Sequence, residues 1–229
     1  MMPADGQPWF HAAVQLLDLR PQDRVLALSC DPGQARDLAA LVGRRGEITV
    51  VSEQGRAAEA IADAAPPQVE VLAHAIDGSE QFGTFDALLV APPFGPLLPS
   101  GYYGGLARRN LRPGGRCVID LPGVDMVPEL SAAGQDLGWP QSRLAALRGI
   151  GDDELAEVLR NAGLRSVHGL LGAHLLHMGA PHELVDRFAA ALRLDAEQRL
   201  DLARALVRRS GGTGPIDVLV HRTRLQALR

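Results

Sequence analysis

The chain has 229 residues and a formal net charge of −4 at pH 7, from 27 acidic and 23 basic residues. This weak acidity argues against a general nucleic-acid or membrane-surface binder, because both need a concentrated positive field. All the basic residues are arginine, which excludes Schiff-base and lysine general-base chemistry. Cys30 and Cys117 are too few for a disulfide framework or a four-cysteine zinc site, and we expect no metal.

The sequence shows neither a signal peptide nor an apolar run long enough to span a membrane. Its length and its 46% of hydrophobic residues suffice to bury a core without disulfides or metals. These features predict a soluble, cytoplasmic α/β domain.

The first two thirds of the chain alternates short apolar runs with amphipathic stretches, a pattern typical of βαβ units and a parallel sheet. Gly43 and the pair Pro66-Pro67 end two of the predicted helices. In chain order we expect a helix over 9–18, a strand over 25–28, a helix over 34–42, a strand over 48–51, a helix over 54–65, strands over 69–72 and 85–90, a helix over 101–111, a turn over 112–115 and a strand over 117–121.

The last third departs from simple alternation. Residues 122–150 are punctuated by Pro and Gly, and we expect irregular structure with some helix over 141–148. A helix over 152–161 begins with two aspartates, which suit the positive end of a helix. The elements expected after it are a strand over 167–178, helices over 183–193 and 195–209, and a final strand over 216–220.

The chain therefore reads as one domain, residues 1–229, with a variable segment at 122–150 and a helical insertion at 183–209. Both inserted helices carry an apolar face. Such an insertion could cover a functional site and shape its pocket, or it could form a surface for a homo-oligomer or another protein partner.

Four stretches, in this order, resemble a class I S-adenosylmethionine (SAM) dependent methyltransferase of the group that acts on small molecules and quinones. Residues 16–52 are similar to its opening strand, glycine loop, helix and second strand, and 85–94 (FDALLVAPPF) to its fourth strand. Residues 111–123 (LRPGGRCVIDLPG) are similar to its turn and fifth strand, and 152–167 to its helix before the sixth strand. The resemblance implies a doubly wound, Rossmann-like, mostly parallel sheet of seven strands with helices on both faces.

The first SAM-binding loop departs from the family pattern, which reads roughly V-L-D-x-G-C-G-x-G. Ala27 replaces the acidic residue, and Ser29 and Asp31 replace two glycines. Cys30 and Gly33 match the pattern. Glycine suits this loop because the backbone approaches the ligand closely and can adopt positive φ. Asp31 adds a carboxylate where the family receives the carboxylate of the methionine moiety, and like charges at close range lower affinity.

The other SAM-contacting positions are altered as well. Ser52 stands where the family has an acidic residue for the ribose hydroxyls, and Glu53 can serve if the turn is shifted by one residue. His74 and Ala75 occupy the loop that faces the adenine, and Ala91 follows the fourth strand. The expected cofactor site thus consists of Ser29, Cys30, Asp31, Gly33, Ser52, Glu53, His74, Ala75 and Ala91.

The run Ala91-Pro92-Pro93-Phe94 is similar to the N/D-P-P-Y/F motif of amino-methylating enzymes. In those enzymes the first side chain accepts a hydrogen bond from the target amine. Ala91 has no such group, which argues against base methylation. A rigid exit from the strand, with Phe94 packed beneath it, is the simpler interpretation.

Candidate catalytic residues lie after the fourth strand and on the sixth. Tyr102 or Tyr103 could orient an acceptor, or both could anchor a surface loop. His174 or His177 could act as a general base toward an acceptor hydroxyl. Histidines that merely fill an apolar strand are the alternative.

Two functions follow from these observations. The first is a SAM-dependent methyltransferase for a small or lipophilic acceptor, which the retained framework favours. The second is a methyltransferase-like protein that has lost SAM binding and serves as a binding or scaffolding subunit, which the altered loop at Asp31 favours. A different nucleotide or acyl ligand in the same cleft is a third interpretation. We lean toward an enzyme whose partner is a small molecule.

Overall fold

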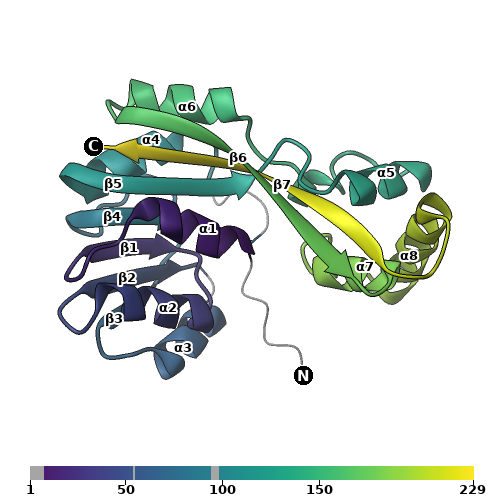
Figure 1. Ribbon diagram of the computed structural model, residues 1–229, viewed down its shortest axis with the longest axis horizontal. Coiled ribbons are helices and arrows are strands. Elements are labelled where there is room, and N and C mark those ends of the chain that lie inside the picture. Colours follow the sequence, from purple (N-terminus) through teal and green to yellow (C-terminus); the bar gives the residue numbers. More distant parts are fainter. Residues whose placement is uncertain (1–7, 54, 94–97) are drawn as a thin grey trace.

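A central sheet organises the molecule. The structure, a computed structural model, describes residues 8–53, 55–93 and 98–229 (Figure 1). Within these residues seven strands form one sheet in the order β3-β2-β1-β4-β5-β7-β6, in which β7 runs opposite to the other six strands. The doubly wound, mostly parallel sheet is therefore confirmed. The strands are β1 (Arg24–Leu28), β2 (Glu47–Ser52), β3 (Val69–Ala73), β4 (Phe85–Val90), β5 (Leu111–Pro122), β6 (Arg165–Met178) and β7 (Ile216–Leu228).

Helices cover both faces of the sheet because successive side chains of each strand point to opposite sides. On β1, Val25 and Ala27 join the apolar cluster under α1 and α2, whereas Leu26 and Leu28 join the cluster under α4 and α6. No helix in the described part of the chain is long and apolar enough to cross a membrane. The helices are α1 (Pro8–Leu17), α2 (Pro32–Val42), α3 (Gly55–Ala64), α4 (Tyr102–Asn110), α5 (Pro128–Asp136), the 3-10 turn η1 (Ala145–Leu147), α6 (Asp152–Asn161), α7 (Pro181–Ala189) and α8 (Ala196–Ser210).

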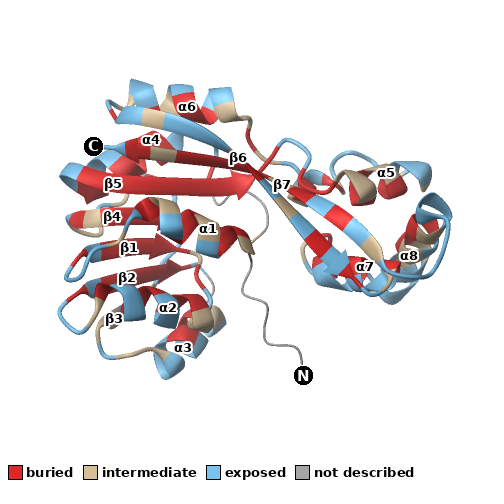
Figure 2. Cartoon of the chain, in the orientation of Figure 1, coloured by how far each residue is buried: buried red, intermediate tan, exposed pale blue. Residues whose placement is uncertain are grey.

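Strands β6 and β7 continue past the end of β5 as a two-stranded arm. β5 stops pairing at Pro122, opposite Arg222, while β6 and β7 remain paired as far as Met178 and Ile216. Helices α5, α7 and α8 gather around the far end of the arm (Figure 1). A separate apolar core forms there between these helices and the arm. Figure 2 shows buried segments along the arm itself. The arm therefore projects beyond the edge at which the parallel strands end.

Three segments differ from the elements expected from the sequence. A helix begins at Pro128, where we expected irregular chain, and the stretch 141–148 holds only the short turn η1. The predicted turn 112–115 lies inside β5, whose register against β4 shifts there. The final strand continues to Leu228 instead of ending at residue 220, because the arginines that interrupt its apolar pattern are buried in ion pairs. The predicted packing of Phe94 falls outside the described residues.

Candidate functional site

A cavity of about 260 Å³ lies at the carboxyl ends of β1 and β2, beside the exit of β4. Ligands of doubly wound sheets bind outside the carboxyl ends of the strands, where the strand order reverses. In this sheet the order reverses between β1 and β4. Four of the expected cofactor residues therefore share one cavity. Its lining consists of Ser29, Cys30, Val51, Ser52, Glu53, Ala57, Ile76 and Pro93.

Ser29 holds a glycine-like backbone at the end of β1. Its φ is 62°, in the left-handed region, and its N–H donates to the carbonyl oxygen of Val51 at 3.1 Å. A residue with a Cβ is strained in this region, and the strain is of the order of 1–3 kcal/mol. The loop therefore keeps at Ser29 the conformation for which the family that the chain resembles uses glycine.

We expect Ser29→Gly to stabilise the protein by about 1 kcal/mol, because glycine removes the strain but loses more entropy on folding. Urea unfolding measures this change. Ser52→Gly is the control, since Ser52 lies in β2 and glycine in a strand costs roughly 0.5–1 kcal/mol. Equal destabilisation by both substitutions would show that Ser29 carries no strain.

Cys30 is buried between β1 and the loop. Desolvation, with a smaller contribution from the charge of Asp31, raises the pKa of its thiol to about 12. Because the thiolate is the nucleophilic form, Cys30 stays protonated and unreactive at neutral pH. It packs instead in the apolar cluster on the α1 and α2 face of the sheet.

Asp31 caps the N-terminus of α2. Its Oδ1 accepts from the N–H of Gln34 at 2.8 Å, and its own N–H donates to Oε1 of Gln34 at 2.9 Å. This reciprocal capping box satisfies two donors at the positive end of the helix. A side chain at Gly33 would crowd it, since a Cβ there would lie 3.1 Å from Oδ1 of Asp31. The carboxylate of Asp31 thus takes the place that an anionic ligand would take at a helix N-terminus.

Glu53 is the only charged residue among the described residues that line the cavity. It is exposed at the end of β2, and its Oε1 lies 3.4 Å from the N–H of Ile76. Carboxylate oxygens accept hydrogen bonds, which suits the two hydroxyls of a ribose, and the buried Ile76 offers an apolar surface for a base. No positive side chain is among the described residues that line the cavity. The lining therefore fits a nucleoside and does not favour an anionic tail.

The remaining expected cofactor residues lie beside this cavity instead of lining it. His74 lines a neighbouring hollow of about 470 Å³ at the end of β3. Its ring meets Phe82 edge-on at 5.6 Å, and its Nε2 lies 3.9 Å from Oε1 of Glu80. Ala75 is exposed, and Ala91 is buried in the core at the end of β4.

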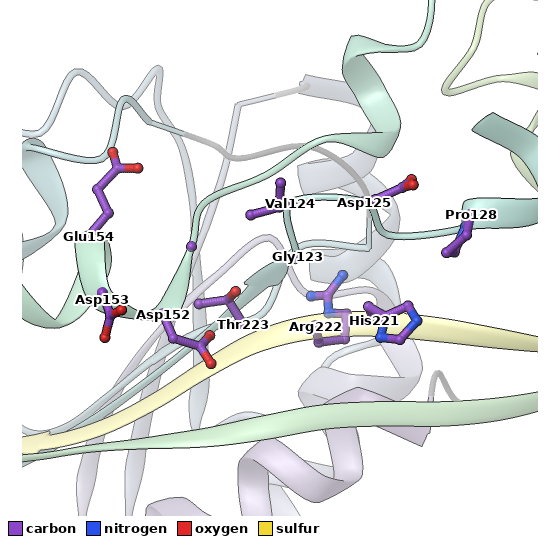
Figure 3. A pocket seen from close by; sticks show the side chains of 11 residues that line it. Gly123, Val124, Asp125, Pro128, Asp152, Asp153, Glu154, His221, Arg222 and Thr223 are labelled. Carbon is purple, nitrogen blue, oxygen red and sulfur yellow. The ribbon is translucent and has the colours of Figure 1, made fainter. Parts of the chain in front are cut away.

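A second, larger cleft of about 640 Å³ opens on the same edge of the sheet, at the end of β5 (Figure 3). The loop after β5 and the first turn of α6 form two of its walls, and β7 forms a third (Figure 3). Val124 is 64% exposed beside it, and Asp125 accepts from Oγ of Ser131 at 2.6 Å. Its described lining consists of Gly123, Val124, Asp125, Pro128, Gly151, Asp152, Asp153, Glu154, His221, Arg222 and Thr223.

Two buried arginines of β7 share one aspartate beneath this cleft. Oδ1 of Asp120 accepts from Nε of Arg222 at 2.6 Å, and Oδ2 accepts from Nε of Arg224 at 2.5 Å. Arg222 also donates to the carbonyl oxygens of Pro92 and Pro93, at 2.8 and 3.3 Å. These charged residues were not among those expected from the sequence, although Arg222 lines the larger cleft and contacts Pro93 of the smaller cavity.

The two candidate histidines of β6 lie in different surroundings. Nη2 of Arg224 is 3.0 Å from Nε2 of His174, which therefore acts as the acceptor. Desolvation, followed by the charge of Arg224, lowers the pKa of His174 and so favours the neutral form of its ring. His177 lies on the exposed arm, where Nδ1 is 2.6 Å from Oδ1 of Asp217.

The two candidate tyrosines begin α4. Tyr103 is fully buried, and its hydroxyl accepts from the N–H of Leu98 at 3.1 Å. Tyr102 is 49% exposed, and its ring lies against Gly78 so closely that a Cβ there would overlap it. Neither tyrosine is among the described residues that line the two cavities of the carboxyl edge.

Comparisons with known proteins establish the fold. No family model and no curated protein matches the chain. Among solved structures, the YcgJ protein from Bacillus subtilis is similar at 14% identity and a TM-score of 0.68, over 98% of this chain and 99% of that one. A SAM-dependent O-methyltransferase from Thermotoga maritima matches at 14% identity and a TM-score of 0.57, over 100% of this chain and 67% of that one. The [4+2]-cyclase SpnF matches at 16% identity and a TM-score of 0.57, over 97% and 80%.

The chain therefore has the fold of the class I SAM-dependent methyltransferases. Because a [4+2]-cyclase is among the similar structures, the fold alone does not determine the reaction.

Proposed function

We propose that the protein is a SAM-dependent methyltransferase that acts on a small or lipophilic acceptor. The observation that carries the proposal is the cavity at the ends of β1 and β2, which Ser29, Cys30, Ser52 and Glu53 line together at the reversal of the strand order. The similarity of the fold to a SAM-dependent O-methyltransferase supports it. Bound SAM would supply an electrophilic methyl group.

The protein's own residues would bind and orient the two reactants. Glu53 would accept hydrogen bonds from the ribose hydroxyls, and Ile76 would contact the base. The cleft beside Val124 would hold the acceptor, on the same edge of the sheet as the donor. Catalysis would then consist chiefly of holding donor and acceptor in line.

Calorimetric titration of the purified protein with SAM and with S-adenosylhomocysteine tests this proposal. We expect micromolar dissociation constants and a rise in melting temperature that follows the ligand concentration. No heat and no thermal shift at millimolar ligand would refute the methyltransferase proposal.

A second candidate function is a binding or scaffolding subunit that keeps the fold without SAM. The capping box of Asp31 favours this alternative, because it fills the helix N-terminus with the protein's own carboxylate. The absence of a positive side chain from the described lining of the cavity favours it as well. The same titration separates the two functions, since only the enzyme needs to bind SAM.

We expect Asp31→Asn to tighten SAM binding about 3- to 10-fold, because it removes a like charge near the carboxylate of the ligand. Asparagine caps helices as well as aspartate does, so α2 should keep its stability. Asp37→Asn is the control, because Asp37 is exposed on the same helix and pairs with His11 at 3.5 Å. If both variants bind SAM as the wild type does, Asp31 does not repel the ligand.

A further inference from the structure

Arg222 lies between the two cavities of the carboxyl edge. It lines the larger cleft at the end of β5 (Figure 3). Its guanidinium reaches the carbonyl oxygens of Pro92 and Pro93, which follow β4. Pro93 in turn lines the smaller cavity, together with Ser29 and Glu53. One buried side chain therefore connects the lining of the larger cleft to the wall of the smaller cavity.

The contacts of the Arg222 guanidinium fix its position. Its Nε donates to Oδ1 of Asp120 at 2.6 Å, and its Nη2 donates to the carbonyl oxygens of Asp120 and Pro92, both at 2.8 Å. Its Cζ lies over the ring of Trp9, 5.2 Å from the ring centre. The side chain is completely buried. A planar fork with several donors can make these bonds at once, whereas a lysine ammonium cannot reproduce their geometry.

We infer that Arg222 is a positioning residue, which holds the exit of β4 in place through Pro92 and Pro93 and so sets the affinity of the smaller cavity for its ligand. The inference rests on the proposed function, in which that cavity binds SAM. Arg224 provides an internal comparison. It shares Asp120 and is also buried, but its further contacts are the carbonyl oxygen of Trp9 and the ring of His174.

Arg222→Lys and Arg224→Lys test the inference as a matched pair. Both should lower the melting temperature, because each disturbs the same buried aspartate. Only Arg222→Lys should weaken S-adenosylhomocysteine binding. We expect a loss of about 10-fold, which corresponds to the net free energy of one hydrogen bond at the wall of the cavity. Calorimetric titration measures the dissociation constants. Equal affinity in the two variants would overturn the inference.

Pro92→Gly keeps the test decisive if Arg222→Lys does not fold. This substitution frees the exit of β4 but leaves the ion pairs of Asp120 untouched. It should weaken S-adenosylhomocysteine binding to a similar degree with little change in melting temperature. Unchanged affinity in Pro92→Gly would overturn the inference.

Hydrogen exchange of the Ala91 amide provides a readout that needs no ligand. This residue directly precedes the two prolines and is only 2% exposed. Its amide should exchange at least several-fold faster in Arg222→Lys than in Arg224→Lys. If the wild type binds no S-adenosylhomocysteine, the proposed function fails. Equal exchange rates of the Ala91 amide in the two variants would separately overturn the positioning role of Arg222.

Discussion

Replacement of Asp120 by alanine is expected to lower the free energy of unfolding by about 3–5 kcal/mol, because it leaves two buried guanidinium groups without a counter-charge. The side chains of Asp120 and Arg222 are completely buried, and that of Arg224 is 7% exposed. Arginine cannot lose its proton to escape such a site. The cluster already carries one more positive than negative charge, so removal of its aspartate is especially costly.

Urea unfolding of the Asp120→Ala variant measures this loss. Asp136→Ala is the matched control, because Asp136 also pairs with an arginine, Arg209, at 2.9 Å, but both side chains are nearly half exposed. We expect the control to lose less than about 1 kcal/mol. Similar losses in the two variants would mean that water or a rearranged side chain compensates the buried arginines.

The same buried cluster supports both the fold and the candidate site. Asp120 and Arg224 are direct neighbours across β5 and β7, and Arg222 extends the cluster to the exit of β4. Two buried arginines on one aspartate are weak evidence for stability as such, since desolvation offsets most of the attraction. The contacts of Arg222 with the carbonyl oxygens of Pro92 and Pro93 give this arginine a second role, which is to hold the segment that leaves the sheet after β4.

The parallel part of the sheet could be predicted from the sequence because its central strands β1, β2 and β4 are buried on both faces. Such strands appear as short apolar runs, for example Val25 to Leu28 and Phe85 to Val90, separated by helical periodicity. The helix that begins at Pro128 was not predicted, because the Pro and Gly residues of 122–150, Gly134 among them, indicate irregular chain. The structure explains this glycine, since a Cβ there would lie 2.9 Å from Leu144.

The buried arginines were missed because apolar periodicity treats a charge as the end of a strand. A signal was nevertheless present in the sequence. Asp120 interrupts an otherwise apolar strand, and Arg222 and Arg224 are two residues apart, so that they share one face of β7. The positions expected to bind a cofactor came instead from the resemblance to a family. That resemblance could not reveal that Asp31 completes a capping box with Gln34.

Glu53→Ala is expected to weaken S-adenosylhomocysteine binding about 100-fold, because a carboxylate that accepts from two ribose hydroxyls contributes roughly 1.5–3 kcal/mol per bond before solvent exposure reduces it. Glu53→Gln should lose about 10-fold, since an amide oxygen accepts more weakly than a carboxylate. Neither change should alter stability much, because Glu53 is exposed and its one described contact, with Ile76, is 3.4 Å long.

Glu59→Ala is the matched control, since Glu59 is an exposed acid on α3 outside the described lining of the cavity. Its variant should bind S-adenosylhomocysteine as the wild type does. Ser52→Ala decides which residue takes the acidic role at the end of β2. If Ser52→Ala abolishes binding while Glu53→Ala does not, the ribose contact lies at Ser52 and the one-residue shift is wrong. Loss of binding in Glu53→Ala alone places the contact one residue further along the chain, where the cavity has its single described negative charge.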